Sequence, residues 1–216
     1  MRTRILLVED NVELLPVYAE GLADFGFDDV VTFSDTTNIV ERLAAAYTGP
    51  SILLTDVFLH PLTATRYLPE LAPAGLKLPV VLMSSITDPI QLNSLVLQCQ
   101  YCGFFSKGKN AQIFLSQLAL HLADMADRAE NAWAAYSERQ HARAMVRGLK
   151  DTQKMSKEKK LEVLRHIVAF EDAADIARNL GVGTTTVYEL RKEFMGWITE
   201  AHTARRLQAF IDAVRD

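Results

Sequence analysis

The sequence predicts a doubly wound α/β fold with a five-stranded parallel sheet, followed by a long helix and an all-α region. Up to about residue 109, short runs that are apolar throughout alternate with segments of helical periodicity. Strands of this kind are typical of a parallel sheet that helices cover on both faces. From Asn110 onward the chain has no Pro, and only four Gly residues interrupt its helical periodicity.

The composition narrows the class of protein. The chain has 216 residues, of which 49% are hydrophobic and 23% charged, and this globular composition excludes wholesale disorder. Its two Cys residues cannot build a disulfide scaffold and fit a reducing cytosol. Its apolar runs are far shorter than the ~20 residues that span a bilayer, so we expect a cytoplasmic protein with no membrane partner. A net charge of −4 does not by itself indicate nucleic-acid binding.

The alternating pattern predicts five strands and four helices between them. The strands are expected at 4–8, 29–33, 51–55, 80–83 and 103–106. The helices are expected at 12–25, 36–47, 63–71 and 89–100. In a doubly wound sheet, ligands bind at the carboxyl ends of the strands, so the residues that follow the strands are the candidates for function.

The residues at that edge are carboxylates, two hydroxyls and one ammonium group. They are Glu9, Asp10, Asp56, Ser84, Ser85 and Lys107. Neighbouring carboxylates repel one another and need a counter-charge, which a hard cation such as Mg²⁺ supplies. A Lys and a hydroxyl opposite that cation suit a phosphoryl group, and a carboxylate can itself be the nucleophile that forms an aspartyl phosphate.

Four segments carry a resemblance to a known family. In order, they are "RILLVEDN", "SILLTDVFLHP", "PVVLMSS" and "GFFSKG", and together they resemble the signature segments of the response-regulator receiver domain. The resemblance implies a flavodoxin-like receiver domain over residues 1–122. It also implies a sensor histidine kinase as partner. The only chemistry expected is the Mg²⁺-dependent phosphorylation and dephosphorylation of the domain itself, so we do not expect a standalone enzyme.

The resemblance assigns roles to single residues. It implies Asp56 as the phosphoacceptor and Mg²⁺ as the cofactor. The implied ligands of Mg²⁺ are Glu9, Asp10, Asp56 and the backbone carbonyl of Phe58. The residues implied to bind the phosphoryl group or to switch with it are Ser84, Ser85, Phe104 and Lys107.

The central segment, residues 123–153, is expected to be a helical linker that continues the last receiver helix. Between residues 110 and 150 nothing breaks a helix before Gly148. An apolar stripe follows the 4-3 spacing of a coiled-coil seam at Ala111, Leu115, Leu118, Leu122, Met125, Ala129, Ala132 and Tyr136. This stripe needs a partner, which is either the same helix of a second copy, giving a homodimer, or the C-terminal helices of the same chain.

Residues 154–216 are expected to form a helix-turn-helix output domain with an extra C-terminal helix. Helices are expected at 172–179 and from about 184, separated by a turn in which Gly181 takes the left-handed conformation, and a tail helix is expected at 198–214. Thr184 or Thr185 is expected to cap the second helix. "ADIARNLGV" and "TTTVY" resemble the scaffold and recognition helices of the LuxR/NarL-type output domain.

This second resemblance implies DNA as a partner and transcription regulation as the output. The candidate DNA-contacting residues are Thr184, Thr185, Thr186, Tyr188, Glu189, Arg191 and Lys192. Residues 152–216 carry 11 basic and 10 acidic side chains, a net charge of only +1. Because DNA affinity rests largely on phosphate neutralisation, a second interpretation stays open, in which the helical domain binds a protein such as RNA polymerase or an anti-factor.

Overall fold

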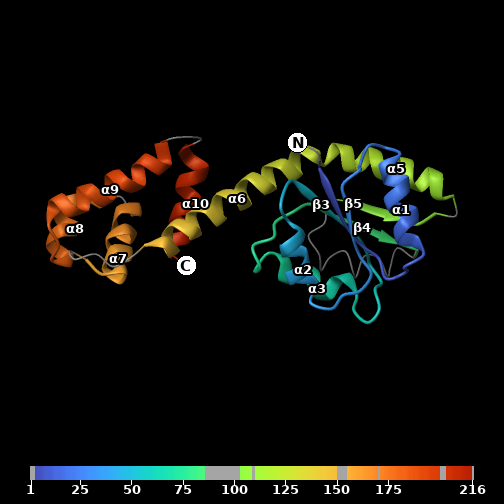
Figure 1. Ribbon diagram of the computed structural model, residues 1–216, viewed down its shortest axis with the longest axis horizontal. Coiled ribbons are helices and arrows are strands. Elements are labelled where there is room, and N and C mark those ends of the chain that lie inside the picture. Colours follow the sequence, from blue (N-terminus) through green and yellow to red (C-terminus); the bar gives the residue numbers. More distant parts are fainter. Residues whose placement is uncertain are drawn as a thin grey trace. The chain divides into compact units, whose positions relative to one another are not determined.

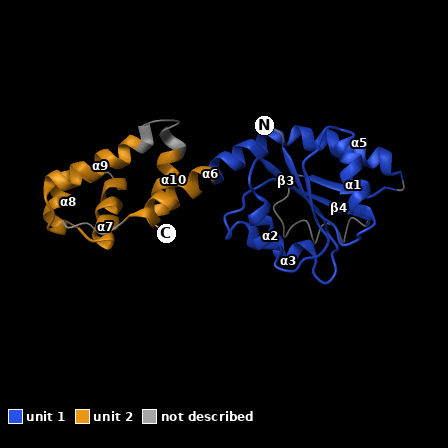
Figure 2. Cartoon of the chain, in the orientation of Figure 1, with its two compact units in different colours: residues 1–136 blue, residues 137–216 orange. Residues whose placement is uncertain are grey.

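The computed structural model describes residues 3–85, 103–108, 110–149, 155–169, 171–199 and 203–215. The chain divides into two compact units, unit 1 over Met1–Tyr136 and unit 2 over Ser137–Asp216 (Figure 2). Unit 1 has a hydrophobic core on each face of its sheet, and unit 2 has a core of its own. The expected helix at 89–100 lies outside the described residues.

Unit 1 contains a parallel sheet of five strands in the order β2-β1-β3-β4-β5. The strands are β1 (Arg4–Val8), β2 (Val30–Phe33), β3 (Ser51–Asp56), β4 (Val80–Ser84) and β5 (Gly103–Ser106). The strand order reverses between β1 and β3, so the switch point lies where β1 and β3 end. The predicted fold class is therefore confirmed.

The central strands are buried on both faces, which explains why they read as uninterrupted apolar runs. In β1, Leu6 and Val8 face one core, whereas Ile5 and Leu7 face the other. Successive side chains of a strand point to opposite faces of the sheet, so both sets must be apolar when helices cover both faces. Figure 1 shows α2 and α3 on one side of the sheet and α1 and α5 on the other.

The helices of unit 1 are shorter than the periodicity predicted. They are α1 (Leu14–Ala23), α2 (Ile39–Ala46), α3 (Ala64–Leu71) and α5 (Ala111–Asp124). The expected start of α2 at residue 36 is wrong, because Asn38 takes a left-handed conformation with φ 46° just before the helix. Asp35 accepts a hydrogen bond from the amide of Thr37 at 2.9 Å, so this segment forms a turn and not the first turn of a helix.

The long helix predicted from residue 110 is divided in two. α5 ends at Asp124, and α6 (Ala126–Gly148) begins after Met125. The amide of Met125 bonds to the carbonyls of His121 and Leu122, both at 3.1 Å. The prediction of an unbroken helix is therefore wrong, because the helix is interrupted at one residue, Met125.

The stripe that predicted a coiled-coil seam is largely buried within unit 1. Leu115, Leu118, Leu122, Met125 and Ala129 belong to the core between the sheet, α1 and α5. These side chains are therefore occupied by the sheet and α1, which are not the C-terminal helices expected as the intramolecular partner. The homodimer through the central helix stays a prediction.

An aromatic group fixes the start of α6 to the rest of unit 1. Trp133 and Tyr136 both contact Tyr47, which is 3% exposed. The centroid of the Tyr47 ring lies 5.1 Å from that of Trp133 and 4.7 Å from that of Tyr136. The Tyr47–Trp133 pair is nearly edge-on, at an interplanar angle of 85°, an arrangement that aromatic quadrupoles favour. The first half of α6 is therefore part of unit 1.

Unit 2 is a helical bundle around one apolar core. Its helices are the end of α6, α7 (Lys157–Val168), α8 (Ala173–Leu180), α9 (Thr184–Thr199) and α10 (Thr203–Arg215). Val187, Leu190 and Phe194 of α9 are all buried in that core. The predicted tail helix at 198–214 is wrong in its start, because α9 continues to Thr199 and α10 begins at Thr203.

None of the helices in the described part of the chain combines the length and the apolar character that a membrane span requires.

Candidate functional site

The carboxyl edge of the sheet brings together the charged residues that the sequence singled out. Glu9 directly follows β1, Asp56 is the last residue of β3, and Lys107 directly follows β5. β1 pairs with β3, and β4 pairs with both β3 and β5 in parallel, so these three strand ends lie along the same edge of the sheet. The parallel sheet therefore converts three distant stretches of sequence into one site.

Lys107 is the centre of this site. Its Nζ forms ion pairs with the Glu9 carboxylate, at 2.5 Å, and with the Asp56 carboxylate. The side chains are only 13%, 2% and 11% exposed for Lys107, Glu9 and Asp56. One ammonium thus holds two buried carboxylates that would otherwise repel each other.

Asp10 completes a group of three carboxylates. One oxygen each of Glu9, Asp10 and Asp56 lies within 4.8 Å of the others, a spacing at which a single cation can contact all three. Asp10 accepts a hydrogen bond from the amide of His60 at 2.9 Å, and Glu9 accepts one from the amide of Asn11 at 3.2 Å. An all-oxygen donor set suits a hard cation such as Mg²⁺, so these residues could hold the predicted metal.

Burial shifts the proton affinities at the site. Burial raises the pKa of Glu9 above its usual range, although the hydrogen bond and the charge of Lys107 oppose this. Burial tends to lower the pKa of Lys107, but hydrogen bonds to Asp56 and Glu9 outweigh it, so the net pKa is raised. The stability that Lys107 provides is therefore fully present below the ordinary pKa of a lysine and is lost only as the pH rises through the raised value.

The loop after β3 orients Asp56. The amide of Phe58 donates a hydrogen bond to Oδ1 of Asp56 at 3.1 Å, and Lys107 donates to the other oxygen, Oδ2. The described contact of Phe58 with the site is therefore through its amide. That the Phe58 carbonyl is a metal ligand remains a prediction.

Two supporting tyrosines were missed by sequence reasoning. Tyr67 donates a hydrogen bond to the hydroxyl of Thr55 at 2.6 Å, and that hydroxyl donates to the carbonyl of Asp56 at 2.8 Å. On the other side, the ring of Tyr18 lies 5.8 Å from Nζ of Lys107, within reach of a cation–π contact. Both tyrosines lie on helices at positions that read as ordinary core, and no signal in the sequence connects them to the site.

The predicted phosphoryl-binding residues lie at the ends of β4 and β5. Ser84 is fully buried, and its carbonyl accepts a hydrogen bond from the Lys107 amide at 2.7 Å, so the two residues are adjacent. Ser85 is exposed. Phe104 is half-buried and packs against the core on the α2–α3 side of the sheet. Their roles toward a phosphoryl group remain predictions.

α8 and α9 follow one another with the predicted turn at Gly181 between them. Asp172 caps α8 by accepting from the amide of Ala174 at 2.8 Å, and Gly181 ends it in the left-handed conformation at φ 60°. The expectation that Thr184 or Thr185 caps α9 is wrong, because α9 begins at Thr184 and the amide of Val187 bonds to the carbonyl of Gly183.

Most of the DNA-binding candidates lie on the outer face of α9. Thr186 is half-buried, whereas the exposed candidates are Thr184, Thr185, Tyr188, Glu189 and Lys192. Arg191 differs from them, since it is half-buried and donates through Nη2 to the carbonyl of Glu171 at 3.0 Å. This bond fixes α9 to the start of α8, so Arg191 has a structural role that the sequence did not predict.

Comparisons with known proteins extend this description. No protein-family model matches the chain, and no curated protein matches it. Among solved structures, the response regulator StyR matches 100% of this chain and 99% of its own, with a TM-score of 0.51 and 15% identity. Full-length FixJ from B. japonicum matches 99% of this chain and 98% of its own, with a TM-score of 0.48 and 16% identity.

A third structure matches only part of the chain. A response regulator receiver domain protein from Clostridium thermocellum matches 58% of this chain and 95% of its own, with a TM-score of 0.49 and 17% identity. The match to StyR shows that the chain has the fold of a response regulator chain, and at 15% identity it shows the fold alone.

Proposed function

We propose that this chain is a phosphorylation-controlled response regulator of a bacterial two-component system, and that it acts as a DNA-binding transcription regulator. The observation that carries the proposal is the pairing of one buried ammonium, Lys107, with the two buried carboxylates Glu9 and Asp56 at the switch point of the sheet. Burying two carboxylates is costly, and a structural core does not need it. A phosphoryl-transfer site does need it, because the transferred group requires a nucleophile, a metal and a cation.

Each residue of the site has a place in this proposal. Asp56 is the nucleophile and accepts the phosphoryl group from a sensor histidine kinase. Glu9 and Asp10 hold Mg²⁺, which neutralises charge on the phosphoryl oxygens. Lys107 pairs with Asp56 before phosphorylation and with a phosphoryl oxygen afterwards, while Ser84 and Phe104 respond to the new group.

The output follows from unit 2. Its helix pair α8–α9 resembles DNA-reading helix pairs, in which the second helix enters the major groove. Phosphorylation of unit 1 then controls how unit 2 engages its site. In such a system two copies read the two halves of a pseudo-palindromic site, which is how the predicted homodimer enters this proposal.

Selection of DNA fragments by the purified full-length protein tests the proposal. The protein is mixed with sheared genomic DNA with and without beryllofluoride, which mimics the aspartyl phosphate. A Tyr188→Ala/Lys192→Ala variant is run beside it, because both side chains are exposed on α9. Arg191 is left unchanged, since its bond to the Glu171 carbonyl makes a variant there ambiguous.

The control is Lys77→Ala, which removes one exposed positive charge from unit 1. Enrichment of one palindromic motif by the parent and by the control, lost in the α9 variant, would support the proposal. If neither state of the protein enriches any motif, the DNA-binding part of the proposal is wrong.

The alternative output is binding to a protein, and one observation favours it. Tyr188 and Met195 on α9 are 56% and 43% exposed, and Glu189 and Glu193 are exposed beside them. A face with large apolar and acidic side chains is less suited to a phosphate-lined groove than to a protein surface. Failure of the DNA selection would leave this output as the one to test.

A further inference from the structure

The second half of α6 carries three arginines on one side of the helix. Arg139, Arg143 and Arg147 are spaced four residues apart, so each lies one turn, about 6 Å, beyond the last. The inward side of the same stretch is apolar, with Ala142 fully buried in the core of unit 2. Arg139 and Arg143 are half-buried at the flank of that core, and Arg147 is exposed.

The start of α7 lies beside the end of this stripe. Nζ of Lys157 donates to the carbonyl of Arg147 at 3.4 Å, which places the first turn of α7 against the last turn of α6. That first turn carries two further lysines, Lys159 and Lys160. The three arginines and three lysines form what we call the basic ridge: Arg139, Arg143, Arg147, Lys157, Lys159 and Lys160. Lys154, which the sequence places near them, lies outside the described residues.

Charge is divided unevenly within unit 2. Residues 137–149 and 155–168 together hold seven basic and three acidic side chains, a net of +4. Residues 171–196, which include α8 and most of α9, hold three basic and five acidic side chains, a net of −2. The helix pair that resembles a DNA reader is thus net acidic, whereas α6–α7, at +4, and α10, at +2, are net basic.

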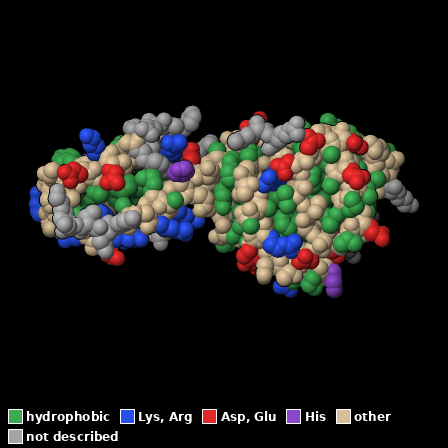
Figure 3. Space-filling view, viewed as in Figure 1, with side chains coloured by type: hydrophobic (Ala, Val, Ile, Leu, Met, Phe, Trp, Pro, Cys, Tyr) green, Lys and Arg blue, Asp and Glu red, His purple; other side chains and the backbone are tan. Residues whose placement is uncertain are grey.

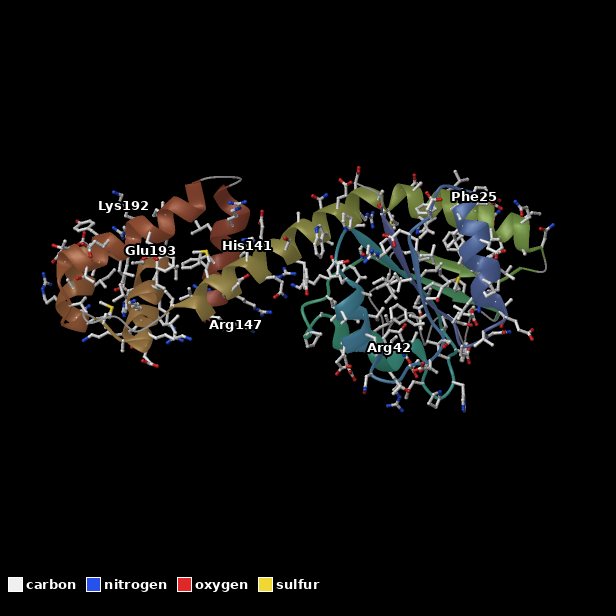
Figure 4. All side chains as sticks on the ribbon, viewed as in Figure 1. Phe25, Arg42, His141, Arg147, Lys192 and Glu193 are labelled. Atoms are coloured by element: carbon white, nitrogen blue, oxygen red, sulfur yellow. The ribbon has the colours of Figure 1, made fainter. Side chains whose placement is uncertain are left out.

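The two surfaces are distinct. In Figure 4, Lys192 extends from the outer side of α9, whereas Arg147 extends from the end of α6 on the other side of unit 2. Figure 3 shows Lys and Arg side chains gathered along the lower edge of unit 2. In its upper part, acidic side chains are mixed with other side chains. A substitution on the ridge therefore leaves the outer face of α9 unchanged.

We propose that the basic ridge of α6 and α7 binds the phosphate backbone of duplex DNA and supplies most of the electrostatic affinity of unit 2. This inference rests on the proposed DNA-binding function and adds a surface to it. Among the described residues of unit 2, the stretches 137–149 and 155–168 carry the largest net positive charge, +4, against +2 for residues 203–215. Phosphate neutralisation with counterion release drives DNA affinity. The acidic α8–α9 pair then contributes contacts in a groove but little of the electrostatic affinity.

The salt dependence of DNA binding tests the ridge. Full-length protein is titrated onto a labelled duplex at several salt concentrations, using both a selected site and an unrelated sequence. The variant is Arg147→Gln/Lys159→Gln, because these two side chains are exposed. Each lost phosphate contact lowers the slope of log K against log salt by about 0.9, so a reduction of about 2 is expected, with affinity for both duplexes falling about tenfold.

The control variant, Arg66→Gln/Lys77→Gln, removes two exposed charges from unit 1 and should change neither slope nor affinity. If the parent protein binds no duplex at all, the proposed DNA-binding function fails and the inference falls with it. If the parent binds but the ridge variant keeps its slope and affinity, the inference alone is overturned and the function stands. Ridge-dependent binding to anionic vesicles without any binding to DNA would also overturn it.

Discussion

The two units of this chain use charge in opposite ways. In unit 1 the decisive charges are buried and satisfy one another, with Lys107 shared by Glu9 and Asp56. Among the described residues of unit 2 no charged side chain is buried, and the side chains of the Arg178–Asp175 pair are 74% and 55% exposed. Burying a charge costs desolvation free energy, so the buried charges of unit 1 indicate a functional site. An exposed charge has little such cost and indicates nothing about function by itself.

The largest effect that tests this contrast is the loss of phosphorylation. Asp56→Ala should abolish labelling of the protein by a radioactive phosphodonor in the presence of Mg²⁺, because it removes the only nucleophile proposed at the site. Asp35→Ala is the control, since Asp35 is a carboxylate in the loop that follows β2 and its partners are the Thr37 amide and Arg42. A labelled Asp56→Ala protein would show that the phosphoacceptor is a different residue.

A core substitution in unit 2 should separate the two units. Phe194 is 2% exposed, with its ring 5.1 Å from that of Phe210. Phe194→Ala should cost unit 2 about 4 kcal/mol of unfolding free energy through lost burial and a cavity. Hydrogen exchange resolved along the chain should show the loss of protection in α7–α10.

Phosphorylation of Asp56 in that variant should continue, because its strands and helices belong to a separate core. The control is Met195→Ala, the neighbouring side chain, which is 43% exposed and should have little effect. Loss of protection in the sheet of unit 1 as well would mean that the two units unfold together.

The same contrast explains what could be predicted from the sequence. The strands and the residues at their ends were predictable because a two-sided parallel sheet demands apolar runs and the chemistry demands particular side chains after them. The break at Met125 was not, since nothing in the local pattern separates it from helix. The turn before α2 did have a local signal, the run of Ser, Asp, Thr and Asn at 34–38, but the prediction extended the helix through it. The roles of Tyr18 and Tyr67 were hidden because they depend on tertiary contacts with Lys107 and Thr55.

The ends of α8 in unit 2 could be predicted from the sequence, but the contacts of its side chains could not. Asp172 and Gly181 mark the ends of α8 because capping and left-handed positions have strong residue preferences. The bond from Arg191 to the Glu171 carbonyl could not be read from the sequence, in which an arginine on a recognition-like helix indicates DNA. A surface residue has several uses, and only its contacts decide between them.

Removing the shared cation of unit 1 should reveal the cost of its buried carboxylates. Lys107→Met should lower the unfolding free energy of unit 1 by about 3 kcal/mol at neutral pH, because it leaves Glu9 and Asp56 buried without a counter-charge. The raised pKa of Glu9 should rise further in this variant. A carboxyl group with a raised pKa in the folded state destabilises that state as the pH rises above its ordinary value.

The deficit of Lys107→Met should therefore be small near pH 4 and grow toward neutral pH, as followed by denaturant unfolding across that range. Mg²⁺ should recover part of the stability, since it supplies the missing positive charge to the same carboxylates. Lys77→Met, which removes an exposed lysine, is the control and should show neither effect. A deficit that stays constant with pH would mean that packing, and not charge, is what Lys107 provides.

The smallest effect concerns two glycines of unit 2 that an alanine should affect in opposite directions. Gly181 ends α8 at φ 60°, where a side chain is strained although there is open space around it. Gly181→Ala should therefore cost about 1 kcal/mol, from backbone strain alone. Gly196 lies inside α9, also with no atom within 4 Å of an added Cβ, and Gly196→Ala should stabilise unit 2 by about 0.5–1 kcal/mol through helix propensity. Equal effects of the two changes in denaturant unfolding would contradict the left-handed turn on which the helix-turn-helix assignment depends, because only a helical residue at position 181 would gain from alanine as Gly196 does.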